Sequence, residues 1–452
     1  MAVKLASLLR QPPGDARRFV PAGEYRTRAA DLDYVEEEWF AAGEDQAGRS
    51  YATQVFVRRP RNADRFSGTI IVESLHVHGI APIYMYTSPY ILRSGHGWAC
   101  VASQKVALDA HVKSASPERY AELQIAADPA SGGTAADLAT PPFRSGSGAE
   151  ARGAWWSEMA RYNAASPTIL AQVGAALRGP GGPFDGYDVG RVLLAGHSQT
   201  GFVATNYIRE AHAAQRREGG APVYDGFFPA GFPAAPFGRS GVPIVQVMSD
   251  GDVSNPRFSF QPGFEGRAYR RADSDAPEDR YRLYELASVP HMTTRYPPFN
   301  DPAMWTQGPT VGNIPPDAIM NSLPHNEMFE VTLDHLVRWV GQGVAPPRAD
   351  RIEVGADGYF ATDEHGNSLG GVRCAQLDVP RAAYRPNGVG DDDIGTVGTE
   401  APFDGTEMRR LYGQPADYVA RFERRLSELI DQGWMLSEAA GDMRAEAQAQ
   451  RW

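Results

Sequence analysis

Cysteine is nearly absent from this chain of 452 residues, which contains only Cys100 and Cys374. The two lie far apart and form no Cys-x-x-Cys pair, so the sequence excludes a cysteine zinc site and a dithiol redox motif. Cys100 falls within the apolar run WACVAS, where a free thiol behaves as a small buried hydrophobe.

Long apolar runs are also missing. No stretch of about 18 apolar residues occurs, so no transmembrane helix is predicted. The first residues, MAVKLASLLRQPPGDARR, contain only a short apolar piece and no convincing cleavage site. We therefore expect no signal peptide, no membrane partner and a cytoplasmic protein.

Acidic residues outnumber basic ones, which gives a formal net charge of -11. The sequence also contains no basic patch interleaved with aromatic residues. Binding to nucleic acid is therefore not expected, and the acidic balance favours solubility. With 42% hydrophobic and 22% charged residues, the composition is that of a globular protein long enough to bury a large core.

Short apolar, β-branched runs recur along the chain and predict strands. Two alternating runs, 34–43 and 51–60, predict an edge hairpin. Continuous apolar runs bounded by turn residues are typical of parallel strands that are covered on both faces. They occur at 68–74, 97–104, 191–198 and 242–250, and the runs 224–231 and 281–288 are weaker strand candidates.

Helical segments alternate with these strands, and this alternation predicts an α/β protein with a mostly parallel sheet flanked by helices. They are expected within 81–95, 155–179 (interrupted near Pro167), 201–217 and 325–343. Antiparallel strands followed by strand–helix units resemble the order of the α/β-hydrolase fold, whose sheet is of the eight-stranded type.

Three irregular segments fall outside this alternation. Residues 108–147 and 296–323 are rich in loop-forming residues and are predicted to be lid insertions. The core with its insertions then spans residues 1–347. Residues 348–452 form a C-terminal extension that we expect to pack on the core.

The segment GHSQTG places Ser198 between a buried strand and a helix, as a nucleophile elbow does. Such a turn exposes the serine hydroxyl, and the helix N-terminus beyond it favours an oxyanion. Gly196 fills the first small position, but Thr200 stands where the usual motif has glycine. A serine that only caps the helix is the alternative.

The partners of a catalytic serine are expected after later strands, first an acid and then a histidine. Asp252 follows the strand at 242–250 at a suitable spacing from Ser249, and Asp250 is the runner-up. Of the ten histidines, His291 lies just past the last strand, where a general base must sit. His325 is the rival base.

Backbone N–H groups should form the oxyanion hole, one from Gln199 and one from Leu75, His76 or a neighbour. His76-x-His78 lacks a third ligand nearby, so a metal site is not expected. We expect substrate contacts from His78, Tyr84, His197 and His325, although the aromatic segment around Tyr84 also fits a core helix. His335 lies in the middle of a helix and is assigned to packing.

These motifs resemble the α/β-hydrolase superfamily, and more narrowly a bacterial group described as "alpha/beta hydrolase domain" proteins with a Gly-x-Ser-Gln-Ser/Thr-Gly elbow. The resemblance runs roughly from Tyr34 to Ala440. Its acid turn, MSDGD, departs from the more usual Glu-x-Asp pattern and leaves Asp250 and Asp252 open. Five further stretches carry the resemblance: GTIIVES, GHGWACVASQKVALDA, LYELASVPH, LDHLVRWVGQGVAPP and GNSLGGVRCAQLDVPRAAY.

The resemblance implies serine-hydrolase chemistry without cofactor or metal, and we expect a carboxylic ester hydrolase acting on a small to medium, apolar ester. The same residues serve a lactonase, a C–C bond hydrolase or an acyltransferase equally well. A scaffold that kept the fold without activity is a further alternative. The sequence leaves the oligomeric state open, a homodimer included.

Overall fold

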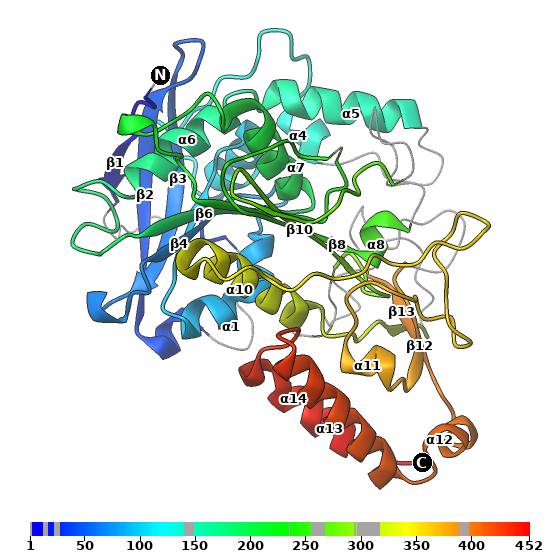
Figure 1. The fold of residues 1–452 in the computed structure, drawn as a ribbon. Coiled ribbons are helices and arrows are strands. Elements are labelled where there is room, and N and C mark those ends of the chain that lie inside the picture. Colours follow the sequence, from blue (N-terminus) through cyan, green and yellow to red (C-terminus); the bar gives the residue numbers. More distant parts are fainter. Residues whose placement is uncertain are drawn as a thin grey trace.

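The computed structural model describes residues 2–11, 17–21, 28–139, 149–234, 236–254, 267–292, 295, 317–387 and 397–452. A sheet in the order β1-β2-β3-β5-β4-β6-β7-β8-β10-β9 crosses the molecule (Figure 1). Its strands are β1 (Ser7–Arg10), β2 (Tyr34–Glu44), β3 (Ser50–Pro60), β4 (Thr69–Ser74), β5 (Gly97–Val101), β6 (Arg191–His197), β7 (Gly226–Ala230), β8 (Ile244–Ser249), β9 (Ser274–Ala276) and β10 (Asp279–Leu286).

The six strands from β5 to β10 in the sheet order run parallel, whereas β1, β2, β3 and β9 pair antiparallel. Of the parallel strands, β4, β5, β7 and β8 are mostly apolar and fully buried, because helices cover both faces. The predicted mostly parallel α/β-hydrolase fold is confirmed. The described sheet has ten strands rather than eight, since β1 and β9 extend its two edges.

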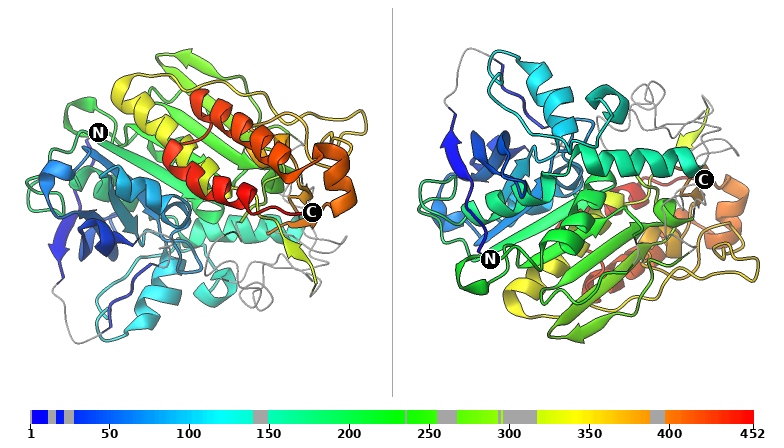
Figure 2. Two further views of the ribbon diagram at one scale, coloured as in Figure 1. Left: turned by 90° about the horizontal axis from the view of Figure 1, so that it is seen from below. Right: turned by 90° about the horizontal axis from the view of Figure 1, so that it is seen from above.

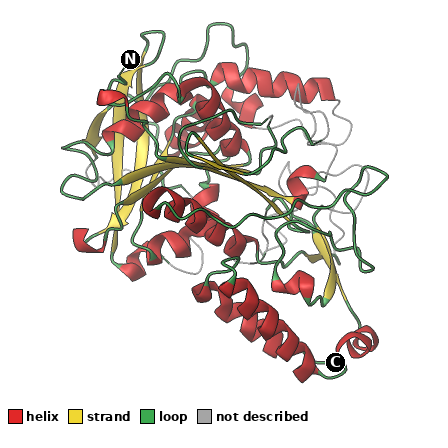
Figure 3. Ribbon diagram, in the orientation of Figure 1, coloured by secondary structure: helices red, strands yellow, loops and turns green. Residues whose placement is uncertain are grey.

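Helices lie above and below the sheet in Figure 1 and appear as red coils in Figure 3. On one face α7 packs on β6 and β7, with α6 against it, and on the other α1 and α10 pack together. The longer helices are α1 (Pro82–Arg93), α5 (Ala149–Tyr162), α6 (Ser166–Ala176), α7 (Gln199–Asn206), α10 (His325–Gln342), α12 (Gly405–Tyr412), α13 (Pro415–Asp431) and α14 (Ala440–Gln448). The predicted interruption near Pro167 is the gap between α5 and α6.

The predicted insertions contain only short elements in their described parts. The first carries α3 (Lys113–Ala115) and α4 (Ala135–Ala139) beside the π-helical turn Leu108–Val112, and residues 140–148 lie outside the described residues. Most of the second, 296–316, also lies outside them. Its remainder contains β11 (Ile319–Met320). That these insertions act as lids stays a prediction.

Residues 348–452 contact the core in several places, of which two illustrate the packing. Val372 pairs with the end of β10, where its N–H donates to Glu285 O (2.7 Å) and its carbonyl accepts from Ala287 (3.0 Å). The turn after α13 lies on α10, where His335 Nε2 donates to Gly433 O (2.8 Å). Figure 2 shows α13 and α14 along α10 from below. A small antiparallel sheet joins β11 to β12 (Ala382–Arg385) and β13 (Thr399–Pro402) in the order β11-β13-β12.

Candidate active site

Ser198 occupies a strained turn between β6 and α7. Its backbone has φ 58° and ψ -124°, a conformation that a residue with a Cβ rarely adopts. Gly196 and Gly201 are required by close approach, because a Cβ would lie 2.1 Å from Thr200 O at the first position and 2.2 Å from Ala230 O at the second. The glycines therefore allow the turn that presents the Ser198 hydroxyl.

Thr200, which replaces the usual second glycine, fits this turn without clash. Its Oγ1 accepts from the N–H of His197 and donates to the His197 carbonyl, both at 2.9 Å. The threonine thus ties the end of β6 to the first turn of α7. The departure from the usual motif supplies two hydrogen bonds that glycine lacks.

The loops after β6, β8 and β10 bring Ser198, Asp252 and His291 together. His291 Nε2 lies 2.8 Å from Ser198 Oγ, and His291 Nδ1 is hydrogen-bonded to Asp252 Oδ1. All but a small part of the His291 and Asp252 side chains is buried. With Nδ1–H donating to the carboxylate, Nε2 is left as the acceptor for the Ser198 O–H.

Asp252 is held by the short helix α8 (Asp250–Val253), which begins immediately after β8. Its Oδ2 accepts from the N–H of Ser249 at 2.6 Å, so both carboxylate oxygens have a partner. Gly251 permits the loop after β10 to approach, because a Cβ there would lie 2.6 Å from His291 N.

Asp250, the runner-up acid, faces other partners. Its Oδ2 accepts from Ser288 N (3.0 Å) and from Ser368 Oγ (2.5 Å). Burial raises the pKa of Asp250 to about 6, although these hydrogen bonds act in the opposite direction. Asp250 therefore links the turn after β8 to the loop before His291 and to the C-terminal extension, and it is Asp252 that contacts His291.

The oxyanion side is formed by the start of α7 and by the loop after β4. Gln199 begins α7, as expected for the first donor. The N–H groups of Leu75 and His76 instead donate to Val101 O (2.8 Å) and Ile80 O (3.0 Å). Among the described residues the N–H of Val77 makes no such bond, so this neighbour is an amide of the loop that is available to donate.

His76 and His78 interact with each other. The N–H of His78 donates to His76 Nδ1 at 3.1 Å, which leaves the His76 proton on Nε2. Burial holds the pKa of His76 well below its usual range, and nearby histidines act in the same direction. His111, on the π-helical turn, donates from Nε2 to Val77 O at 2.6 Å and fastens the loop. The His76–His78 pair is part of a tight turn.

His197 and His325 are buried residues that lie beside His291. The rings of His197 and His291 are 4.6 Å apart with 30° between planes, and His325 lies beyond His197, stacked on Phe329. Burial lowers the pKa of His325 to about 3, so it stays neutral. Among the described residues it is His291, and not the rival His325, that is hydrogen-bonded to Ser198.

Tyr84, expected at the substrate site, packs in the core. Its ring lies 4.3 Å from the Trp98 ring and beneath the Arg58 guanidinium. Glu73 accepts from the N–H groups of Ile83 and Tyr84 and so fixes the start of α1. Tyr86, two residues further along α1, contacts His197, with ring centroids 5.1 Å apart.

Two groups near Ser198 were not singled out by sequence reasoning. Gln104 forms an amide pair with the Gln199 side chain. The second group is an aromatic cluster, in which Trp156 of α5 contacts Phe202 of α7 and Phe232 after β7. Trp155 contacts Trp156 and completes the cluster. The partners Phe202 and Phe232 lie 46 and 76 residues after Trp156, so a local sequence pattern does not reveal this cluster.

Within the described part of the chain, one group of three side chains could share a metal ion. It consists of His197, Asp252 and His291, whose ligand atoms lie within 4.8 Å of one another. The Asp252 and His291 atoms that face each other are already joined by a hydrogen bond, and the His197 and His291 rings lie 4.6 Å apart with 30° between their planes. A metal ion at this point would have to displace the hydrogen bond between Asp252 and His291.

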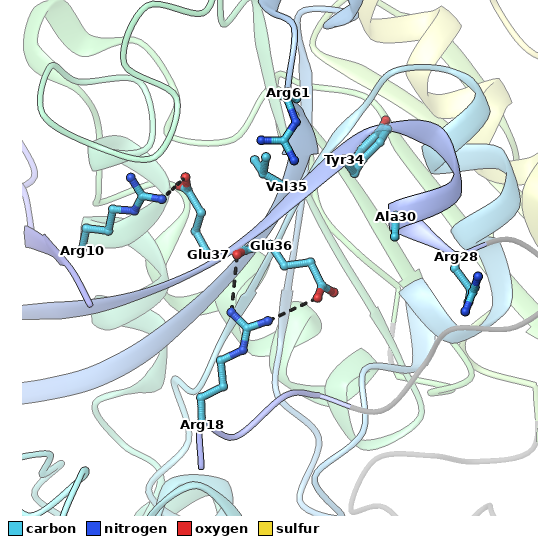
Figure 4. A pocket seen from close by; sticks show the side chains of 9 residues that line it. All are labelled: Arg10, Arg18, Arg28, Ala30, Tyr34, Val35, Glu36, Glu37 and Arg61. Carbon is cyan, nitrogen blue, oxygen red and sulfur yellow. Dashed lines mark hydrogen bonds and ion pairs between the residues drawn. The ribbon is translucent and has the colours of Figure 1, made fainter. Parts of the chain in front are cut away.

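A surface hollow of about 540 Å³ lies at β1 and β2, separated from β6 by three strands (Figure 4). Its arginines are engaged with neighbouring acids. Arg10 pairs with Glu37 at 3.0 Å and Arg18 with Glu36 at 3.3 Å. Arg28 and Arg61 bind Asp31 and Asp33, each at 2.9 Å. These ion pairs neutralise the hollow and set it apart from the Ser198 site.

No helix in the described segments is both long and apolar enough to cross a membrane.

Three solved structures share low sequence identity with this chain. A putative dienelactone hydrolase from Klebsiella pneumoniae subsp. pneumoniae MGH 78578 is 12% identical, with 56% of this chain and 85% of that chain covered and a TM-score of 0.30. LpqC, a poly(3-hydroxybutyrate) depolymerase from Bordetella parapertussis, is 13% identical, with 68% and 91% covered and a TM-score of 0.33.

The third, Est1E from Butyrivibrio proteoclasticus, is 9% identical, with 54% and 87% covered and a TM-score of 0.27. A comparison with curated protein sequences found no match. The family model described as "Alpha/beta hydrolase domain" matches residues 9–445, nearly the whole length. The chain therefore belongs to the α/β-hydrolase domain family.

Proposed function

We propose that this protein is a serine hydrolase that cleaves carboxylic esters, with Ser198 as nucleophile, His291 as general base and Asp252 as the acid that orients it. The observation that carries the proposal is the continuous hydrogen-bonded path from Ser198 Oγ through both nitrogens of His291 to Asp252. Nucleophile, base and orienting acid within hydrogen-bond reach are the geometric signature of an activated serine.

The reaction follows from this path. Ser198 Oγ attacks the carbonyl carbon while its proton passes to His291 Nε2, and Asp252 stabilises the imidazolium that forms. The tetrahedral intermediate expels the alcohol, which takes the proton from His291. Water then gives a proton to His291 and attacks the acyl-enzyme, and the same steps release the acid and regenerate Ser198.

Two backbone groups are assigned to the oxyanion. The first is Gln199 N–H at the N-terminus of α7, where the helix dipole adds positive potential. The second is Val77 N–H, because the amides of Leu75 and His76 are already used in the loop. Each donor of this type typically contributes 10²–10³-fold to kcat.

The surroundings favour an apolar substrate. The aromatic cluster of Trp155, Trp156, Phe202 and Phe232 contacts the elbow through Phe202, whose N–H donates to Ser198 O, and through Phe232 beside Gly201. Val77 belongs to the same buried apolar group. An acyl or alcohol portion with substantial apolar area gains most from such a wall.

The test is hydrolysis of p-nitrophenyl esters from acetate to decanoate, with Ser198→Ala as the control. We expect activity that disappears in the variant, together with fluorophosphonate labelling of the native protein only. Labelling without ester cleavage would direct attention to lactones or C–C substrates. If the native protein is neither labelled nor able to cleave any ester, the assignment of Ser198 as nucleophile is refuted.

A further inference from the structure

Gln104 is a fully buried glutamine at the carboxyl end of β5, and the catalytic mechanism gives it no task. Its Nε2 donates to Gln199 Oε1 at 3.0 Å, and its Oε1 accepts from Gln199 Nε2 at 2.5 Å. A third hydrogen bond runs from Gln104 Nε2 to Leu75 O at 2.9 Å. The two amides therefore satisfy each other and a backbone carbonyl in a site closed to water.

These three hydrogen bonds join two segments that are distant in sequence. Gln199 starts α7 and carries the first proposed oxyanion donor. Leu75 starts the loop 75–80, which carries the second at Val77. Because the distance between two oxyanion donors sets how well they surround one oxygen, a link between the two segments bears directly on that geometry.

We propose that Gln104 is a positioning residue that, through the Gln199 side chain and the Leu75 carbonyl, fixes the spacing of the two halves of the oxyanion hole. It touches no reacting atom. The catalytic part of this proposal rests on the proposed function, whereas the mechanical part, that Gln104 couples loop 75–80 to α7, does not.

The neighbourhood explains how Gln104 itself is held. Ser103 Oγ, next to it in sequence, lies 2.8 Å from both Ser74 Oγ and Ser166 Oγ. This chain of buried hydroxyls connects the ends of β4 and β5 to the start of α6. The backbone next to Gln104 is thus held by the hydrogen bonds of Ser103, which supports the amide pair as a positioning group requires.

The experiment compares Gln104→Met with Gln172→Met. Methionine is close to glutamine in size but makes none of the three amide hydrogen bonds. Gln172 is a matched control, because it is also buried and bonds through both amide atoms, to Tyr51 Oη (2.8 Å) and Glu44 O (2.7 Å), at the hairpin edge of the sheet. Both variants lose buried hydrogen bonds, so both should lower thermal stability.

Only Gln104→Met should weaken the stabilisation of the transition state. We expect kcat for an activated ester to fall about 10²-fold, as expected for a misplacement of about 1 Å, with KM changed less than about threefold. A boronic acid that forms a tetrahedral adduct on Ser198 should lose affinity in parallel. Adding Gln199→Met should cost little more, because one pair is broken in either case. Gln172→Met should keep kcat within about twofold.

Hydrogen–deuterium exchange gives a readout that does not need activity. In Gln104→Met, amides in both loop 75–80 and the first turn of α7 should exchange about tenfold faster, whereas Gln172→Met should leave them unchanged. Unchanged exchange in Gln104→Met, or kcat within twofold of the native value, would overturn the proposal. If the native protein cleaves no ester and yet Gln104→Met accelerates exchange in both segments, the proposed function fails while the coupling stands.

Discussion

Asp252→Asn is the substitution that tests the orienting acid most directly. Ser249 N–H can only donate, so the asparagine oxygen must face it and the asparagine NH2 must face His291 Nδ1. The imidazole then accepts at Nδ1 and carries its proton on Nε2, where it can no longer take the Ser198 proton. A wrong tautomer of this kind lowers kcat by about 10⁴-fold, or about 5 kcal/mol of transition-state stabilisation.

Asp250→Asn is its matched control, two residues away and equally buried. An asparagine oxygen can keep the hydrogen bonds from Ser288 N–H and the Ser368 hydroxyl, so kcat for p-nitrophenyl esters should stay within about threefold of native. Both variants should melt cooperatively, measured by circular dichroism. The reasoning is refuted if Asp252→Asn keeps a tenth of native kcat, or if Asp250→Asn loses more than a hundredfold.

Three further predictions concern strain, packing and charge. Ser198→Gly should unfold with about 1 kcal/mol more stability than Ser198→Ala in urea, because glycine accepts φ 58° without strain; equal stabilities would contradict this. Gly196→Ala should be strongly destabilised, by about 3 kcal/mol or more, since its Cβ would collide with Thr200 O; a native melting temperature would show that the turn can relax. Burial raises the pKa of Asp250 from 3.8 to about 6, so between these values the native state holds a proton that the unfolded chain has released. Stability should therefore fall as the pH rises through this window, by up to about 3 kcal/mol, and Asp250→Asn should flatten that slope in urea titrations from pH 4 to 8.

Local patterns were sufficient for the parallel part of the sheet. The runs that end at Ser74, His197 and Ser249 are mostly apolar and bounded by turn residues, so the composition of each run predicts its burial on both faces. The edge strands β1 and β9 were not predicted, because β1 has four residues and β9 three. Segments this short and of mixed polarity show no alternation of apolar and polar residues. Their pairing depends on partners distant in sequence, which a local window does not contain.

The candidate site divides in the same way. Strand ends identify Ser198 and His291, because the parallel topology brings the carboxyl ends of strands together. The choice between Asp250 and Asp252 needed three-dimensional contacts, since both are acids in one turn and only their partners distinguish them. Tyr84 and Tyr86 lie on different sides of one helix, and which side faces His197 follows from how α1 packs, not from the residue types. Gln104 lies in a stretch that carries the family resemblance, but its contacts with Gln199 and Leu75 could not be predicted, because the partners of a neutral amide depend on the fold.

The hydrogen bond between Asp250 and Ser368 has a consequence for the order in which a ribosome makes this molecule. Ser198, Asp252 and His291 are synthesised first, and the segment that braces the turn of the acid follows roughly 80 residues later, about 4–16 s at ordinary elongation rates. Until Ser368 and Val372 emerge, Asp250 lacks one partner and the end of β10 lacks its pairing segment. In a nascent or prematurely terminated chain the turn that carries Asp250 and Asp252 therefore lacks this support, so the geometry around His291 is completed late in translation.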